Sequence, residues 1–168
     1  MELYESIYGR YSSRQYESRP VPEEVLQRIL EAGSAAAVGK RRFDTLHLTV
    51  IESDEAWQAV RSLYGDADPS YGAPLMLLIS ARAQADRPGI EYANAACVIE
   101  NMMLAATAEG LGSCYIWGML LTLKEDGALC KKLGIPDGFV PASAMLLGYA
   151  ADAPRPKTPE MKLTMNRA

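Results

Sequence analysis

The segment from residue 91 to residue 118 constrains the fold of this chain more than any other part of the sequence. Nearly every turn between Ala95 and Ala108 is apolar, and on a helical wheel the apolar positions cover well over half of the circumference. A surface helix has an apolar stripe only about 100° wide, so we expect this helix to be buried on most sides. Such a helix is typical either of a plain domain core or of an interface between subunits.

Glycines end this helix, and a short strand follows it. Gly110 and Gly112 can adopt the left-handed or tight backbone that terminates a helix. Residues 113–116, which end at Ile116, are predicted to form the strand. Trp117 and Gly118 are then expected in a turn where the backbone can approach a ligand closely.

Length and composition limit the functional classes open to this chain. Its 168 residues suit one domain with a real core, and its net charge of -4 argues against nucleic acid as a partner. No apolar run reaches about 18 residues, so we expect no membrane span. The acidic start lacks the features of a signal peptide, and the three cysteines contain no C-x-x-C pair, which predicts reduced thiols in a cytoplasmic protein.

A single histidine narrows the chemistry further. Most zinc sites are excluded, and a Ser-His-Asp mechanism would require His47 itself. His47 alternates with leucines in an expected strand, which favours a packing or surface role. Cys114 is expected to be a small core residue rather than a redox thiol.

The rest of the chain alternates between helices and strands joined by polar loops. No repeat, phosphate-binding glycine motif or metal-ligand cluster interrupts this pattern, which indicates an α/β or α+β fold with one central sheet. A proline-rich and basic tail from residue 150 has too few apolar residues to fold on itself. The expected helices cover residues 2–8, 20–33, 53–63, 95–108 and 124–133, and the expected strands cover residues 46–51, 75–79, 113–116 and 142–149.

Two arginines near the start of the chain form the clearest candidate binding site. Arg10 and Arg14 are four residues apart and enclose Tyr11, Ser12 and Ser13. Guanidinium groups bind phosphate through two hydrogen bonds, and hydroxyl or backbone N–H groups can fill the remaining acceptors. The same segment could also be a solvated basic turn, and the residues alone leave both alternatives open.

Four stretches together resemble the nitroreductase-like family of FMN-dependent NAD(P)H oxidoreductases, in one of its short forms. The first is similar to the opening R-R-S-x-R-x-F motif of that family, and the second continues it as family members do. The third resembles the family's central helix and the strand after it, and the fourth its closing strand and tail. The stretches are residues 10–16, 19–26, 94–116 and, taken together, 133–136 with 147–157.

The resemblance implies an α+β fold with a central, mostly antiparallel sheet sandwiched by helices. It also implies an intertwined homodimer with two FMN sites at the subunit interface, which agrees with the apolar central helix. Residues 1–168 would form a single domain, with a C-terminal arm of about 150–168 that packs on the partner subunit. No membrane or nucleic-acid partner is expected.

The resemblance assigns the phosphate end of the flavin to both ends of the chain. Arg10 and Ser12 would hold the 5′-phosphate, with Arg155 and Lys157 of the tail nearby. Tyr11 stands where many family members have a second arginine, which predicts weaker phosphate binding or compensation by the tail.

The ring end of the flavin is assigned to a second group of residues. Arg14 would reach the ribityl chain or the pyrimidine edge. Trp117 and Gly118, which follow Ile116, would present backbone N–H groups to flavin N5 and O4, where donors stabilise charge on the reduced ring. Arg42 occupies the place of an asparagine that contacts the pyrimidine in other members, and it would either donate to the flavin O2 region or point to solvent.

The implied activity is a ping-pong transfer in which NADH or NADPH gives hydride to flavin N5 and an electron-poor nitroaromatic or quinone then accepts it. The cofactor carries the chemistry, so no catalytic side chain is required. The middle of the chain is short, so we expect an open acceptor pocket, for which Tyr71 and Tyr92 are candidate lining residues. Two alternatives remain: a flavin-binding or redox-sensing module with little turnover, and a non-flavin dimeric scaffold in which Arg10 and Arg14 form structural ion pairs.

Overall fold

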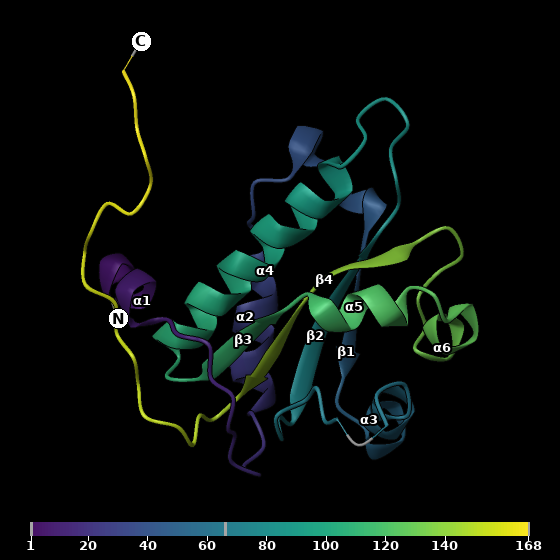
Figure 1. Cartoon of the computed structure of the whole chain (residues 1–168), viewed down its shortest axis with the longest axis horizontal. Coiled ribbons are helices and arrows are strands. Elements are labelled where there is room, and N and C mark those ends of the chain that lie inside the picture. The colour runs from purple at the N-terminus through teal and green to yellow at the C-terminus, as the bar shows by residue number, and fades with distance from the viewer. Residues whose placement is uncertain (1, 66, 168) are drawn as a thin grey trace.

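Antiparallel pairing of four strands organises the structure, a computed structural model that describes residues 2–65 and 67–167 (Figure 1). The sheet order is β1-β2-β4-β3, and each neighbouring pair is antiparallel, as expected. Positions 1, 66 and 168 of the expected single domain lie outside the described residues. The strands are β1 (Leu46–Ile51), β2 (Leu75–Ala81), β3 (Gly112–Ile116) and β4 (Val140–Gly148).

Helices cover both faces of the sheet, which confirms the predicted sandwich. On one face lie α2 (Glu23–Ser34) and α4 (Ile90–Ala108), with α1 (Leu3–Gly9) packed against α4. On the other lie α3 (Asp54–Arg61), α5 (Gly118–Leu123) and α6 (Gly127–Lys132). Two short 3-10 helices, η1 (Gly39–Arg41) and η2 (Phe43–Thr45), lead into β1.

Strand β2 joins the two hydrophobic cores. All of its residues are buried, and alternate side chains point to opposite faces of a strand. Leu77 and Ile79 therefore contribute to the core under α2 and α4, whereas Met76 and Leu78 contribute to the core under α3 and α5. The continuous apolar run in the sequence correctly predicted a strand that is buried on both faces.

Helix α4 buries only its inner side within one chain, so the expected burial on most sides is not met by the single chain. Ile99 and Met103 are buried in the core, but Ala93, Cys97 and Glu100 are exposed along the outer side. The reason is that α1, α2 and the sheet cover only part of the circumference. A shallow groove between α1, α2 and α4 remains open, and its lining is mainly apolar.

The expected helix at residues 124–133 is wrong in its extent. Helix α5 already begins at Gly118, where a turn was expected, and ends at Leu123. A new helix, α6, begins at Gly127 because the Asp126 side chain caps it by accepting a hydrogen bond of 2.9 Å from the Leu129 N–H. Residues 118–132 therefore form two short helices separated by the polar residues Lys124 to Asp126.

The two ends of the chain meet beside β3. Gly112 of β3 pairs with Gly148 of β4, and a Cβ atom on Gly112 would lie 2.7 Å from the Ala150 Cβ. The same Cβ would lie 3.1 Å from the Ser13 Cβ. The absence of a side chain thus lets residues 10–16 and the start of the tail pack against the same strand. Beyond this point the tail runs past α1 without helix or strand and is exposed (Figure 1).

We expect Gly112→Val to lower the free energy of unfolding by about 1–3 kcal/mol, because the added side chain must displace Ala150 or Ser13. Urea denaturation at a fixed protein concentration measures this loss. Gly127→Val is the matched control, since no atom lies within 4 Å of a Cβ built there, and it should stay within about 0.5 kcal/mol of the wild type. Equal stability of all three proteins would contradict the close packing at Gly112.

Candidate functional site

The amino-terminal segment is anchored by Asp152 of the tail. The Ser13 hydroxyl donates to the Asp152 carboxylate, and the Arg14 N–H lies 3.4 Å from its other oxygen. The Tyr11 hydroxyl donates to the Asp152 carbonyl at 3.0 Å. Ser13 is fully buried, and its N–H donates to the Ser113 carbonyl of β3 at 3.0 Å. Asp152 therefore fixes the segment that carries the two predicted flavin-binding arginines, Arg10 and Arg14.

Hydrogen bonding sets the charge of Asp152. Burial acts to raise the pKa of this carboxyl, but the hydrogen bonds from Ser13 and from the Arg14 N–H outweigh it and hold the pKa below its usual value. The nearby Arg155 guanidinium acts in the same direction. Sequence reasoning missed Asp152, because nothing in the local pattern of the tail indicates a contact with residues near position 13.

Four of the predicted site residues meet in one hollow. Arg14, Ile116, Trp117 and Gly118 line a space of about 230 Å³ at the junction of β3 and α5. Ile116 is buried, whereas Trp117 is exposed and packs edge-on against Tyr92 of α4, with 5.8 Å between the ring centroids. No side chain caps the first turn of α5. The hollow also contains Pro69, Tyr71, Cys114, Tyr115 and Met119.

Arg10 and Lys157 form a pair of neighbouring cations where the end of α1 meets the tail. Burial and the charge of Arg10 lower the pKa of the Lys157 ammonium, while Glu100 opposes them. The Lys157 N–H donates to the Tyr8 carbonyl at 2.7 Å, which ties the tail to the end of α1. The charges of Arg10 and Lys157 repel one another, and an anion beside both would relieve this repulsion.

The buried thiol of Cys114 lines the hollow and is subject to the charges of both Arg14 and Arg10. Burial raises the pKa of this thiol, and Arg14 and Arg10 both act against that rise. Within residues 2–65 and 67–167, no carboxylate forms an ion pair with Arg10, Arg14 or Lys157. The observed contacts do not support the alternative that Arg10 and Arg14 form structural ion pairs.

The remaining predicted residues are Ser12, Tyr11, Arg155 and Arg42, and they do not line the hollow at the junction of β3 and α5. Ser12 forms an isolated bridge with Ser113, which places it beside Cys114. Tyr11 uses its hydroxyl on Asp152, and the exposed Arg155 lies near both. Arg42 is exposed and donates to Asp44 at 2.8 and 3.0 Å. In the single chain it therefore points to solvent, the second of its two expected orientations, and does not line the hollow.

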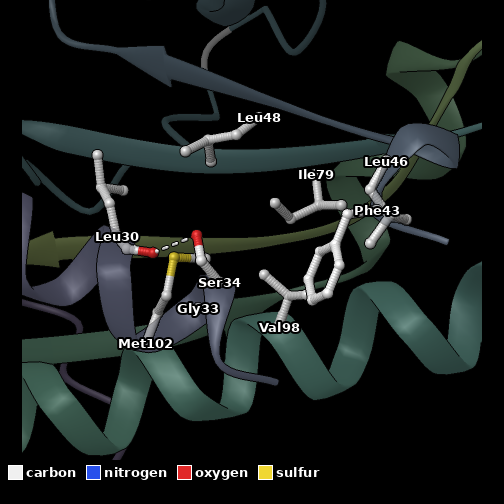
Figure 2. A pocket seen from close by; sticks show the side chains of 9 residues that line it. All are labelled: Leu30, Gly33, Ser34, Phe43, Leu46, Leu48, Ile79, Val98 and Met102. Atoms are coloured by element: carbon white, nitrogen blue, oxygen red, sulfur yellow. Dashed lines mark hydrogen bonds between the residues drawn. The ribbon is translucent and has the colours of Figure 1, made fainter. Parts of the chain in front are cut away.

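A separate apolar hollow lies between α2, α4 and the β1 side of the sheet (Figure 2). Leucine, isoleucine, valine, methionine and phenylalanine side chains dominate its lining. Its one polar side chain, Ser34, donates back to the Leu30 carbonyl at 3.2 Å, as Figure 2 shows. Nothing in this lining can hold a phosphate, so the space does not suit FMN.

Other sequence expectations concern metals, membranes and single side chains. Among the described residues, no group of three or more His, Cys, Asp or Glu side chains is arranged to hold a metal ion. None of the described helices is both long and apolar enough to span a bilayer. His47 packs edge-on against Phe139 at 6.3 Å, and Cys114 is buried, which agrees with the packing roles predicted for both.

The fold and the site define an α+β protein with a hollow, lined in part by Arg14, where the end of β3 meets α5. The chain belongs to the nitroreductase family, whose family model matches residues 7–70 and 48–149. This membership confirms the resemblance inferred from the four sequence stretches.

Three relatives illustrate the similarity. A crystal structure of a Bacteroides fragilis nitroreductase with bound FMN is 27% identical, with a TM-score of 0.82 over 99% of this chain and 100% of that one. A Desulfitobacterium hafniense nitroreductase structure, at 24% identity and a TM-score of 0.81 over 99% of this chain and 100% of that one, supports the fold. A Methanothermobacter thermautotrophicus protein provisionally named NADH dehydrogenase/NAD(P)H nitroreductase is 28% identical over 92% of this chain and 80% of its own length.

We expect Asp152→Asn to remove a pH-dependent part of the stability. The folded-state pKa of Asp152 lies below its unfolded value of about 3.9, so its stabilising effect is complete above that value and is lost as the pH falls through the folded pKa. The wild type should exceed the variant most above about pH 5, and the gap should begin to narrow near about pH 4 and close only at lower pH, where the carboxyl is protonated in the folded state. Urea denaturation across this range tests it.

Asp137→Asn, at an exposed carboxylate in the loop between α6 and β4, is the control for the loss of one negative charge. It should not produce the same gap. If Asp152→Asn and Asp137→Asn follow the wild-type curve equally, Asp152 does not anchor the segment.

Proposed function

We propose that this protein is an FMN-dependent oxidoreductase that takes electrons from NADH or NADPH and passes them to an electron-poor small molecule of the nitroaromatic or quinone type. The observation that carries the proposal is a hollow lined by Arg14, Trp117 and Gly118, whose buried Cys114 is also subject to the charge of Arg10. Membership of the nitroreductase family and the FMN-bound relative at 27% identity support the same conclusion. The three free cysteines fit a reducing, cytoplasmic environment.

The phosphate end of FMN fits the charges of the two chain ends. Arg10 and Lys157 repel one another, and a dianionic phosphate between them would replace this repulsion with charge-assisted hydrogen bonds. The Ser12 hydroxyl, on the same segment as Arg10, would donate to a phosphate oxygen. Arg155 would add charge from the tail. Tyr11 contributes no cation, because its hydroxyl is bonded to Asp152.

The ring end of FMN fits the hollow at the junction of β3 and α5. Bound FMN supplies the ability to accept a hydride from one substrate and donate it to the next. Arg14 would stabilise negative charge at the pyrimidine edge, and the Trp117 and Gly118 N–H groups would orient the opposite polar atoms. Because burial raises the pKa of Cys114, this thiol stays protonated at neutral pH and forms an inert wall. One open hollow for both substrates favours their binding in turn, as a ping-pong mechanism requires.

Purified protein with bound or added FMN should show a flavin spectrum that bleaches under anaerobic NADH or NADPH.

We expect Arg10→Ala to weaken FMN binding by about 10- to 100-fold, since a hydrogen bond to a charged group contributes about 1.5–3 kcal/mol. Flavin fluorescence titration measures the change. Arg28→Ala, at an exposed arginine paired with Glu109, should bind FMN like the wild type.

Two outcomes would redirect the proposal. A colourless protein that ignores added FMN would refute it. FMN binding without NAD(P)H oxidation above the rate of free flavin would instead identify a flavin-binding or redox-sensing module with little turnover.

We infer further that the active form is a homodimer. A hollow of about 230 Å³ is smaller than the roughly 300–1,000 Å³ that ligand pockets of this kind enclose, so one chain supplies only part of the walls. The outer side of α4 and the apolar groove beside α1 are uncovered in the single chain. A second copy packed along α4 would cover both and complete the site.

The tail has the pattern of a strand that packs on another copy. Met161, Leu163 and Met165 alternate with polar residues and are 72%, 79% and 68% exposed. The tail leaves its own domain beside β3, whereas β1 is the opposite edge of the sheet and has a free side (Figure 1). We therefore place the partner's tail along β1, where these side chains can enter the apolar hollow of Figure 2.

Leu163→Asp should weaken dimerisation by about 10- to 100-fold, which corresponds to the loss of one buried leucine. Sedimentation analysis at several concentrations measures the dimer. Thr164→Asp is the matched control, because in an extended segment its side chain points to the other face. If both variants dimerise equally, or if the wild type is a well-folded monomer, the tail does not hold the subunits together.

A further inference from the structure

Tyr71 has an unusual backbone conformation for a large aromatic residue. Its φ is 50°, in the left-handed region that favours glycine, and it is followed by Gly72 with a φ of 78°. A side chain of this size is a genuine outlier there. Such strain persists only where the surrounding structure over-determines the conformation, and it gathers at functional sites.

The turn that contains Tyr71 is held on both sides. The Ser70 side chain is fully buried, and its hydroxyl donates to Asp68 while accepting from the Gly72 N–H at 3.2 Å. Arg61 of α3 donates to the same Ser70 hydroxyl at 3.2 Å. After the turn, the Trp57 indole N–H donates to the Pro74 carbonyl at 3.0 Å. This network fixes the strained residue instead of letting it relax.

The constrained backbone directs the Tyr71 ring to the site. The side chain is 43% exposed, so the turn does not serve to bury it. The Arg14 guanidinium carbon lies 5.9 Å from the ring centroid, within the range of a cation–π contact. Both side chains line the hollow that also contains Trp117 and Gly118.

We propose that Tyr71 is a positioning residue, which holds the Arg14 guanidinium against the ring-binding hollow. The inference rests on the proposed function and adds a residue to it. A guanidinium group that is held in place does not have to reorient when negative charge develops on a bound ring. A mobile arginine would instead be solvated by water and would have to reorient first. Tyr71 thereby favours the reduced form of FMN over the oxidised form. Ligand binding also shields the contact from water, and a desolvated cation–π contact is stronger than an exposed one.

Tyr71→Asn in the full-length protein tests this role, because asparagine tolerates the left-handed region and lacks the ring. We expect the dissociation constant for oxidised FMN to rise about 3- to 30-fold. Reduced FMN should lose about tenfold more affinity than oxidised FMN, which lowers the midpoint potential of the bound flavin by about 30 mV. The FMN-free variant should unfold at the same or a higher urea concentration than the wild type, since the strain is relieved.

Two further variants separate positioning from a general structural role. Tyr71→Phe keeps the ring and should stay within about threefold of the wild type in FMN affinity. In an Arg14→Gln background, Tyr71→Asn should have little further effect, because the group through which it acts is gone. Tyr71→Gly, which also accepts the left-handed backbone, repeats the test if the asparagine variant folds poorly.

The outcomes distinguish this inference from the proposed function. A wild type that fails to bind FMN overturns the proposed function, and this inference with it. A wild type that binds FMN while Tyr71→Asn keeps its affinity and midpoint potential overturns this inference alone. Effects of Tyr71→Asn and Arg14→Gln that add fully overturn it as well, since Tyr71 would then not act through Arg14.

Discussion

The contact between Asp152 and the segment at residues 11–14 is the interaction on which the site depends. The carboxylate is bound by the Ser13 hydroxyl and faces the Arg14 N–H, both neutral donors, and not by a guanidinium group. An acid placed here could easily have neutralised Arg14. Because its oxygens are directed to the hydroxyl and the backbone, the acid fixes the segment and leaves the arginine charge available to a ligand. Gly112 makes the arrangement sterically possible.

The sequence predicted those helices and strands whose structure is determined by residues close together in the chain. The apolar run in β2 and the proline and glutamate start of α2 fix their structures through burial, capping and backbone preference, and both were predicted correctly. The break between α5 and α6 was missed, because Lys124 and Glu125 are compatible with a helix, whereas the Asp126 side chain caps a new helix that begins at Gly127. The pairing of Arg42 with Asp44 joins residues only two positions apart and could have been weighed from the sequence.

The parts of the site that escaped prediction depend on distant contacts. Ser13 and Asp152 are 139 positions apart, and no periodicity connects an amino-terminal motif with an acid in an irregular tail. Tyr71 was a candidate pocket residue, but its positive φ follows from a network between α3 and the loop, not from its own preference. In both cases the tertiary structure overrides what the residue type alone would favour.

In the proposed function, the charges of the site would link cofactor binding to the order of both chain ends. Arg10 follows α1, and Lys157 lies in the tail, so an anion held between them connects segments that are otherwise joined by a few hydrogen bonds. A ligand that binds only the arrangement in which the ends meet must stabilise that arrangement. The same tail carries the alternating apolar residues that we place on β1 of the partner. FMN binding, the contact between the two chain ends and the association of the subunits would then stabilise one another. Each of them requires the tail to be ordered against a protein surface.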